Sequence, residues 1–81
     1  MKLPRNLSGR ELAHALAALG YQPVHERGSH IRLTTEVPAE HHITIPDHDH
    51  LKVGTMDAIL RDVAHHAGLD HEALVERLFG S

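Results

Sequence analysis

The chain has 81 residues, no cysteine, a formal net charge of −3 with histidine neutral, and one tyrosine and one phenylalanine as its aromatic residues. This length predicts a single domain, residues 1–81, with a thin aliphatic core and no large internal cavity. The lack of cysteine excludes disulfides and thiolate zinc sites. No apolar run approaches the ~18 residues of a membrane span, and no signal segment is evident, so we expect a cytoplasmic protein without membrane contact.

The first predicted helix begins at Ser8. Ser8 and Glu11 have the spacing of a capping box, in which each residue satisfies a backbone amide of the other. Gly20 suits the left-handed end of a helix. Apolar residues recur on one side of the segment between these signals, at Leu12, Ala15, Leu16, Ala18 and Leu19. The pattern predicts an amphipathic helix with one buried stripe.

Three strands are predicted next, over residues 21–27, 30–35 and 41–45. Pro23 has no amide proton, which favours an edge strand for the first. Gly28-Ser29 has the length of a two-residue hairpin turn. Side chains alternate between the two faces of a strand, so one face receives the polar residues His30, Arg32, Thr34, His42 and Thr44. Pro46 ends the third strand, and a polar connection follows it.

Two more helices complete the prediction. The apolar spacing of Met56, Ile59, Leu60, Val63 and Ala67 predicts a helix from about Gly54-Thr55 to Gly68, and Asp70 caps a short third helix. Each longer helix has one apolar stripe, so both should pack on the same face of a three-stranded antiparallel sheet. The other face, with His30, Arg32, His42 and Thr44, should be free of helix. The fold class is α+β.

Charge is unevenly distributed along the chain. Residues 1–35 carry five Lys or Arg against two Asp or Glu, whereas residues 36–81 carry three against nine. The overall acidity argues against a general nucleic-acid binder, because phosphate affinity comes mostly from Lys and Arg. The positive potential nevertheless gathers in the half that contains Arg27-Gly28-Ser29-His30.

The segment from Arg27 to Leu33 is the strongest candidate for chemistry. Cleavage of RNA needs a group that titrates near neutrality to take the 2′-hydroxyl proton, and cations that stabilise the charge on phosphorus. His30 fits the first role, and Arg27 and Arg32 fit the second. The alternative is an ordinary surface histidine near a turn.

Ten histidines also raise the question of a metal site. His48 and His50 could offer two ligands from one side of an extended segment, whereas adjacent helical residues such as His65 and His66 point about 100° apart. We expect solvated histidines, no metal and no cofactor. Their full protonation would change the formal charge from −3 to +7, so any affinity for RNA should strengthen toward acid pH.

Lys52 precedes the second long helix. Exposed amides at a helix N-terminus and one lysine can together hold a phosphate. The alternative is an ordinary helix start.

Taken together, these motifs resemble the HicA toxin family, the RNA-cleaving half of HicA/HicB toxin–antitoxin pairs. The resemblance covers roughly residues 3–69 and leaves residues 70–81 as a C-terminal helical extension. Its motifs are Ser8-Gly9-Arg10-Glu11-Leu12, Leu19-Gly20-Tyr21, Arg27-Gly28-Ser29-His30, Ile45-Pro46-Asp47-His48 and Leu51-Lys52-Val53-Gly54-Thr55-Met56.

The resemblance implies a fold like that of a double-stranded-RNA-binding domain, with metal-independent endoribonuclease activity on mRNA. It also implies neutralisation by a HicB-like antitoxin that covers the active face. The family's catalytic histidine follows Gly-Ser, which places it at His30, and we expect RNA contacts from Arg27, Ser29, Arg32 and Lys52. The alternative function is a non-catalytic RNA-binding or antitoxin-binding module on the same fold.

Overall fold

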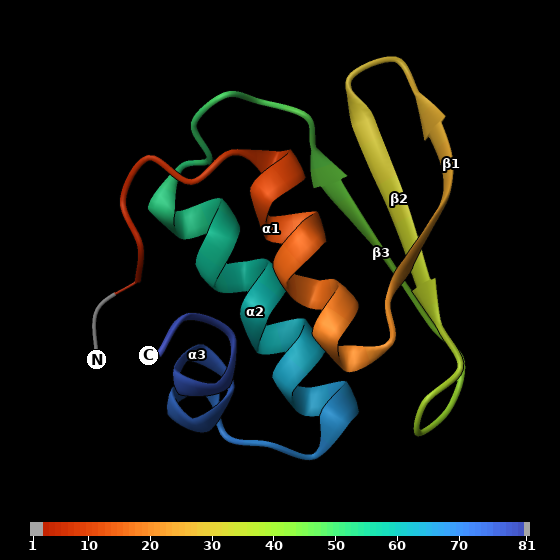
Figure 1. The fold of residues 1–81 in the computed structure, drawn as a ribbon, viewed down its shortest axis with the longest axis vertical. Helices are drawn as coiled ribbons and strands as arrows, with labels where there is room; N and C mark the ends of the chain where they lie inside the picture. Colours follow the sequence, from red (N-terminus) through yellow and green to blue (C-terminus); the bar gives the residue numbers. More distant parts are fainter. Residues whose placement is uncertain (1–2, 81) are drawn as a thin grey trace.

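The computed structural model describes residues 3–80, except for the side chains of residues 25–27. Its elements follow the predicted α-β-β-β-α order with a further C-terminal helix (Figure 1). They are α1 (Gly9–Leu16), the short 3-10 helix η1 (Ala17–Leu19), β1 (Gln22–Arg27), β2 (His30–Thr35), β3 (His41–Pro46), α2 (Val53–Ala67) and α3 (His71–Phe79). The α+β class and its resemblance to a double-stranded-RNA-binding domain are confirmed.

Several predicted boundaries move by one or two residues. The first strand begins at Gln22, because Tyr21 turns into the core and is 2% exposed. Pro46 still belongs to β3, where it pairs with His30 in the register, since the end of a strand tolerates a missing amide proton. The second long helix begins at Val53, with Lys52 as its N-cap residue.

The caps predicted from the sequence are present. The Ser8 hydroxyl accepts the amide of Glu11 at 3.0 Å, and the Glu11 carboxylate accepts the amide of Ser8 at 2.9 Å. The Asp70 carboxylate accepts the amide of Ala73 at 2.7 Å and starts α3. Gly20 and Gly68 take positive φ angles at the ends of η1 and α2, as their places in the sequence predicted.

The sheet is antiparallel with the order β1-β2-β3, so the strand that carries His30 lies in the middle. A register shift between Pro23 and His25 marks a bulge in β1. Burial alternates along the central strand, with Ile31, Leu33 and Thr35 buried. This alternation directs one face of the sheet toward the helices and the other toward solvent.

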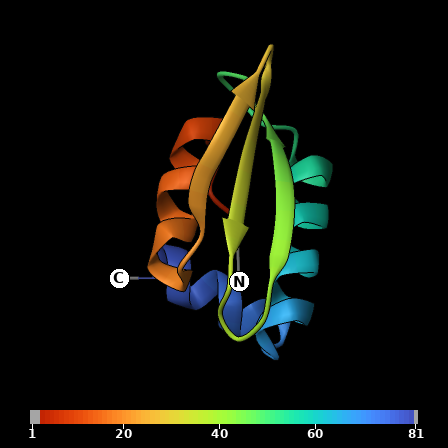
Figure 2. The same ribbon diagram turned by 90° about the vertical axis from the view of Figure 1, so that its right-hand side faces the viewer.

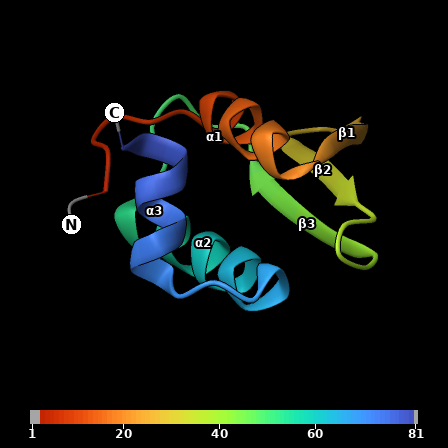
Figure 3. The ribbon, with the colours of Figure 1, turned by 60° about the horizontal axis from the view of Figure 1, so that its bottom comes forward.

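The core lies between the sheet and the helices α1 and α2, which cover the same face (Figure 2). The helix α3 packs against α1 and α2 on the side away from the sheet (Figure 3). It contributes Leu74 and Val75, which are 0% and 1% exposed. The other buried hydrophobic residues are Leu12, Leu16, Tyr21, Ile31, Leu33, Ile43, Ile45, Leu51, Met56, Leu60, Val63 and Ala64.

Among the described residues, no helix has the length and apolarity to cross a lipid bilayer.

Candidate functional site

His30 is the first residue of β2 and directly follows the turn formed by Gly28 and Ser29. Gly28 has a φ of 60°, a conformation that glycine adopts without the steric cost that other residues pay. The His30 side chain is exposed, and none of the side chains that the structure describes, which exclude those of residues 25–27, is hydrogen-bonded to its imidazole. The imidazole is therefore carried by the backbone of a strand and is exposed to solvent, where a ligand can reach it.

The face of the sheet that carries His30 is open. The side chains of His30, Arg32, His42 and Thr44 are all exposed, as predicted. Figure 2 shows the three strands in front of the helices, with none of the described helices crossing that face. Thr44 pairs with Arg32 in the register. Imidazole, guanidinium and hydroxyl groups thus share one accessible surface.

Arg27 and Ser29 flank the same turn. Arg27 ends β1 and is the register partner of His30, although its side chain lies outside the described residues. The Ser29 carbonyl accepts the amide of Asp47 at 2.7 Å, which ties the turn to the chain after β3. The backbone therefore brings Arg27, Ser29 and His30 together at one end of the sheet.

Lys52 is the predicted site residue that the structure does not bring beside the hairpin. It is exposed and precedes α2, whose first turn receives no side-chain cap from it. In Figures 1 and 3 the start of α2 and the β1–β2 hairpin lie on opposite sides of the start of α1. A ligand that contacts both Lys52 and His30 must extend past the N-terminus of α1.

The loop after β3 contacts both the start of α1 and the hairpin turn. The Gly9 amide donates to the His48 carbonyl at 2.9 Å, and the Leu51 amide donates to the Leu7 carbonyl at 2.8 Å. Arg10 in the first turn of α1 donates to the Asp47 carboxylate at 2.9 Å. These contacts hold residues 47–51 against the start of α1, and through Asp47 they reach the turn before His30.

The comparison with protein families decides the identity of the chain. A family described as "HicA toxin of bacterial toxin-antitoxin" matches residues 9–64, which contain α1, the whole sheet and most of α2. The chain belongs to the HicA toxin family. No curated protein and no solved structure gave a match. Membership identifies the chain as a toxin with an antitoxin partner.

In this HicA toxin the matched residues include the hairpin with His30 and end before α3. The helix α3 is nevertheless joined to the matched part. His71 lies with Nε2 2.8 Å from the Asp57 carboxylate, which also accepts a hydrogen bond from Arg61 at 2.7 Å. The Arg61 guanidinium and, to a smaller extent, the charge of His71 hold the pKa of Asp57 below its ordinary value.

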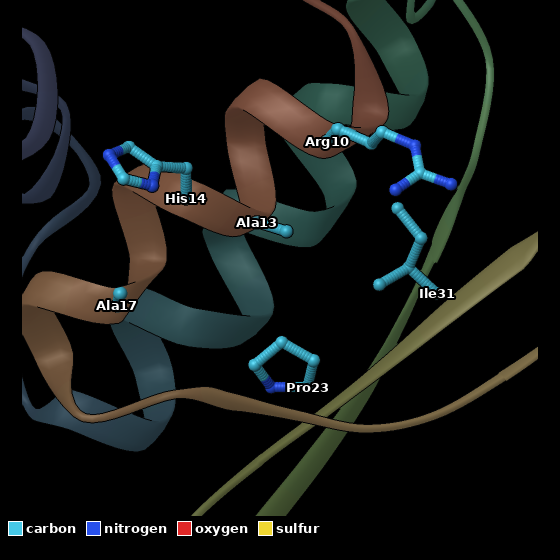
Figure 4. Close-up of a pocket in the computed structure, with 6 residues that line it drawn as sticks. All are labelled: Arg10, Ala13, His14, Ala17, Pro23 and Ile31. Atoms are coloured by element: carbon cyan, nitrogen blue, oxygen red, sulfur yellow. The ribbon is translucent and has the colours of Figure 1, made fainter.

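A groove of about 270 Å³ lies between α1 and the first two strands (Figure 4). Its lining is mostly apolar, with Ala13, Ala17, Pro23 and Ile31, and with Arg10 and His14 at its margin. Ile31 points to the helix side of the sheet, so this groove is separate from the face that carries His30. Its residues can hold an apolar side chain, but they form no acid–base pair.

A cluster of side chains that no sequence motif indicated lies at the other end of β3. His41 Nδ1 lies 2.7 Å from the Tyr21 hydroxyl, and His41 Nε2 lies 3.2 Å from the Asp62 carboxylate. If Nε2 carries the proton, it donates to Asp62 and Nδ1 accepts from Tyr21. The ring of His66 stacks on that of His41 with centroids 4.3 Å apart. Because these residues come from distant parts of the chain, no local motif indicates the cluster.

Burial and the nearby Asp62 charge raise the pKa of Tyr21 to about 12. The Tyr21 hydroxyl therefore keeps its proton at neutral pH. Among the side chains that the structure describes, no three from His, Cys, Asp or Glu are placed to hold a metal ion. His48 and His50 lie exposed in the polar loop that follows β3.

Proposed function

We propose that this HicA toxin is a cytoplasmic endoribonuclease that cleaves mRNA without a metal ion, with His30 as its general base. The observation that carries the proposal is the placement of His30. Its imidazole is exposed beside the turn, on the same helix-free face as Arg32, in a chain of the HicA family. A general base needs this combination of access and a fixed backbone.

In the proposed reaction, the His30 imidazole takes the proton from a ribose 2′-hydroxyl, and the oxygen attacks the adjacent phosphorus. A bond forms between phosphorus and the 2′ oxygen, and the bond to the 5′ oxygen breaks. The departing oxygen takes a proton from the imidazolium or from water. The products are a 2′,3′-cyclic phosphate and a 5′-hydroxyl. DNA lacks the 2′-hydroxyl and should not react.

The proposed RNA contacts are Arg27, Ser29, Arg32 and Lys52. Arg32 shares the face of His30, so its guanidinium can neutralise charge that develops on the phosphate. Lys52 is the N-cap residue of α2, which begins away from the hairpin (Figure 1), and we assign it to a phosphate farther along the RNA. The excess of Lys and Arg over acids in residues 1–35 supports binding of a polyanion at this end of the chain.

We further propose that a HicB-like antitoxin neutralises the toxin by covering the face with His30, Arg32, His42 and Thr44. This face is the exposed side of the sheet, whereas the opposite side is filled by the core. An antitoxin on this face would exclude RNA from His30. Neither the RNA nor the antitoxin in this proposal involves binding to a membrane.

The test is RNA cleavage by the purified toxin in EDTA, with His30→Ala beside the parent chain. Removal of a positioned general base lowers the rate by about 10²–10⁴, while loss of an exposed side chain leaves stability within about 0.5 kcal/mol. We expect His30→Ala to lose cleavage, retain its melting temperature and still bind the antitoxin. His14→Ala is the matched control, because His14 is exposed on α1, away from the open face.

Three results would contradict the proposal. Equal cleavage by His30→Ala and the parent would remove His30 from the reaction. Loss of cleavage in EDTA, with recovery on addition of one metal ion, would establish a metal-dependent enzyme. Binding of RNA by the parent chain without any cleavage would favour the non-catalytic module.

A further inference from the structure

We propose that Asp47 is a positioning residue, which fixes the hairpin that carries His30 relative to α1. This inference rests on the proposed function, because it assigns Asp47 a part in the reaction for which His30 is the base. Asp47 acts through other residues and does not itself touch the substrate.

Asp47 contacts the two parts of the molecule that must be held together. Its amide donates to the Ser29 carbonyl at 2.7 Å, and Ser29 directly precedes His30. Its carboxylate accepts a hydrogen bond from the Arg10 guanidinium at 2.9 Å. His30 itself pairs with Pro46, the residue before Asp47. One residue thus joins the backbone at the catalytic turn to a side chain of α1.

The α1 end of this connection is itself anchored. Arg10 lies in the first turn of α1, which the Ser8–Glu11 capping box closes. The next residues of the helix include Leu12 and Leu16, both fully buried. An ion pair to this helix therefore fixes the position of the hairpin relative to the core. An ion pair between two loops would not.

The hairpin depends on this connection because it projects beyond the helices. Figure 2 shows the β1–β2 turn extending past the helix layer at one end of the sheet. Gly28, Ser29 and His30 are all exposed, so packing does not restrain the turn. Its described restraints are the pairing of β2 with β1 and β3 and the hydrogen bond from the Asp47 amide to the Ser29 carbonyl.

The effect should fall on rate more than on stability. Surface ion pairs contribute little to stability, and the Arg10 side chain is 67% exposed. By contrast, a displacement of about 1 Å at a reacting group can lower the rate on the order of 10²-fold. Loss of the Asp47 carboxylate should therefore lower kcat and leave KM and the melting temperature nearly unchanged.

The experiment measures kcat and KM on an RNA oligonucleotide, together with melting temperatures. We expect Asp47→Ala to lower kcat by about 10- to 100-fold, with KM within about twofold of the parent value. Asp47→Asn keeps a hydrogen-bond acceptor and should recover part of the loss. The double variant Arg10→Asp with Asp47→Arg restores the ion pair in reverse, so its kcat should exceed that of either single variant. The helix tolerates this exchange because aspartate near a helix N-terminus is favourable.

Arg61→Ala is the matched control. It removes another exposed arginine–aspartate pair, which lies on α2 away from the hairpin, and kcat should not change. A kcat for Asp47→Ala within about twofold of the parent would overturn the inference. So would a rise in KM with unchanged kcat, which would make Asp47 part of the RNA-binding surface, or a loss of rate that simply follows a loss of melting temperature.

Failure of the proposed function would look different, because the parent chain itself would not cleave RNA. The positioning can then be measured by amide hydrogen exchange at residue 47, whose amide donates to Ser29. After correction for intrinsic rates, exchange in Asp47→Ala should be about tenfold faster than in the parent if the carboxylate restrains the turn. Equal rates would overturn the inference without reference to catalysis.

Discussion

Gly9 packs against the carbonyl group of Pro46 so closely that a Cβ atom on Gly9 would collide with the carbonyl oxygen. This contact joins the first residue of α1 to the last residue of β3. The Gly9 amide also donates to the His48 carbonyl. Backbone thus packs directly on backbone at the start of the loop that leads from β3 to α2.

Gly9→Ala should destabilise the protein, although alanine is the better helix former. Overpacking of this kind costs about 1–3 kcal/mol, which exceeds the gain in helix propensity of up to about 1 kcal/mol. Gly54→Ala is the matched control, since a Cβ atom on Gly54 in α2 would meet no neighbouring atom within 4 Å, and it should stabilise by some tenths of a kcal/mol. Urea denaturation of both variants measures whether the free energy of unfolding falls or rises in each. A stabilising Gly9→Ala would show that the chain moves freely there.

Tyr21 should make stability fall in alkali. Its pKa is about 12 in the folded protein and 10 as the ordinary value, so the folded state holds the proton more tightly. The contribution is complete below pH 10 and is lost as the pH rises toward 12. Tyr21→Phe should unfold more easily at neutral pH by about 1 kcal/mol, through loss of the hydrogen bond to His41, and should lose less stability above pH 10 than the parent. Parallel alkaline dependence in the two chains would contradict this.

Leu74→Ala should destabilise the protein by about 2–5 kcal/mol, because Leu74 is fully buried. This is a specific expectation for α3, which lies outside the residues that match the HicA family. Glu72→Ala, an exposed change in the same helix, should stay within about 0.5 kcal/mol. Thermal unfolding compares the two. A small effect of Leu74→Ala would mean that α3 is not part of the cooperative core.

Glu11 should contribute to stability at neutral pH and lose that contribution in acid. Its hydrogen bond from the Ser8 amide lowers its pKa below the ordinary value of 4.5. The contribution is therefore present above pH 4.5 and disappears as the pH falls through the lower folded value. Glu11→Gln should lose less stability than the parent as the pH is lowered, which urea titrations at several pH values measure. An unchanged acid profile would argue against the ionised capping box.

Local signals in the sequence were sufficient for the elements and for one side of the site. The capping box at Ser8, the helix end at Gly20 and the turn at Gly28-Ser29 each depend on residues a few positions apart, and all three are present. Alternation along β2 placed His30 and Arg32 on the face without helices for the same reason, because strand side chains alternate whatever surrounds them. The motifs likewise identified the HicA family.

Only the tertiary structure decided which distant residues meet. Tyr21 is hydrogen-bonded to His41, which stacks on His66, and Arg10 pairs with Asp47. No sequence motif links the members of these pairs. The structure also decided that Lys52, the N-cap residue of α2, lies apart from the β1–β2 hairpin. Periodicity and capping arise within one turn of helix or one strand, so the sequence alone determined them. Contacts between elements depend on how the faces pack, and that is set by the whole core at once.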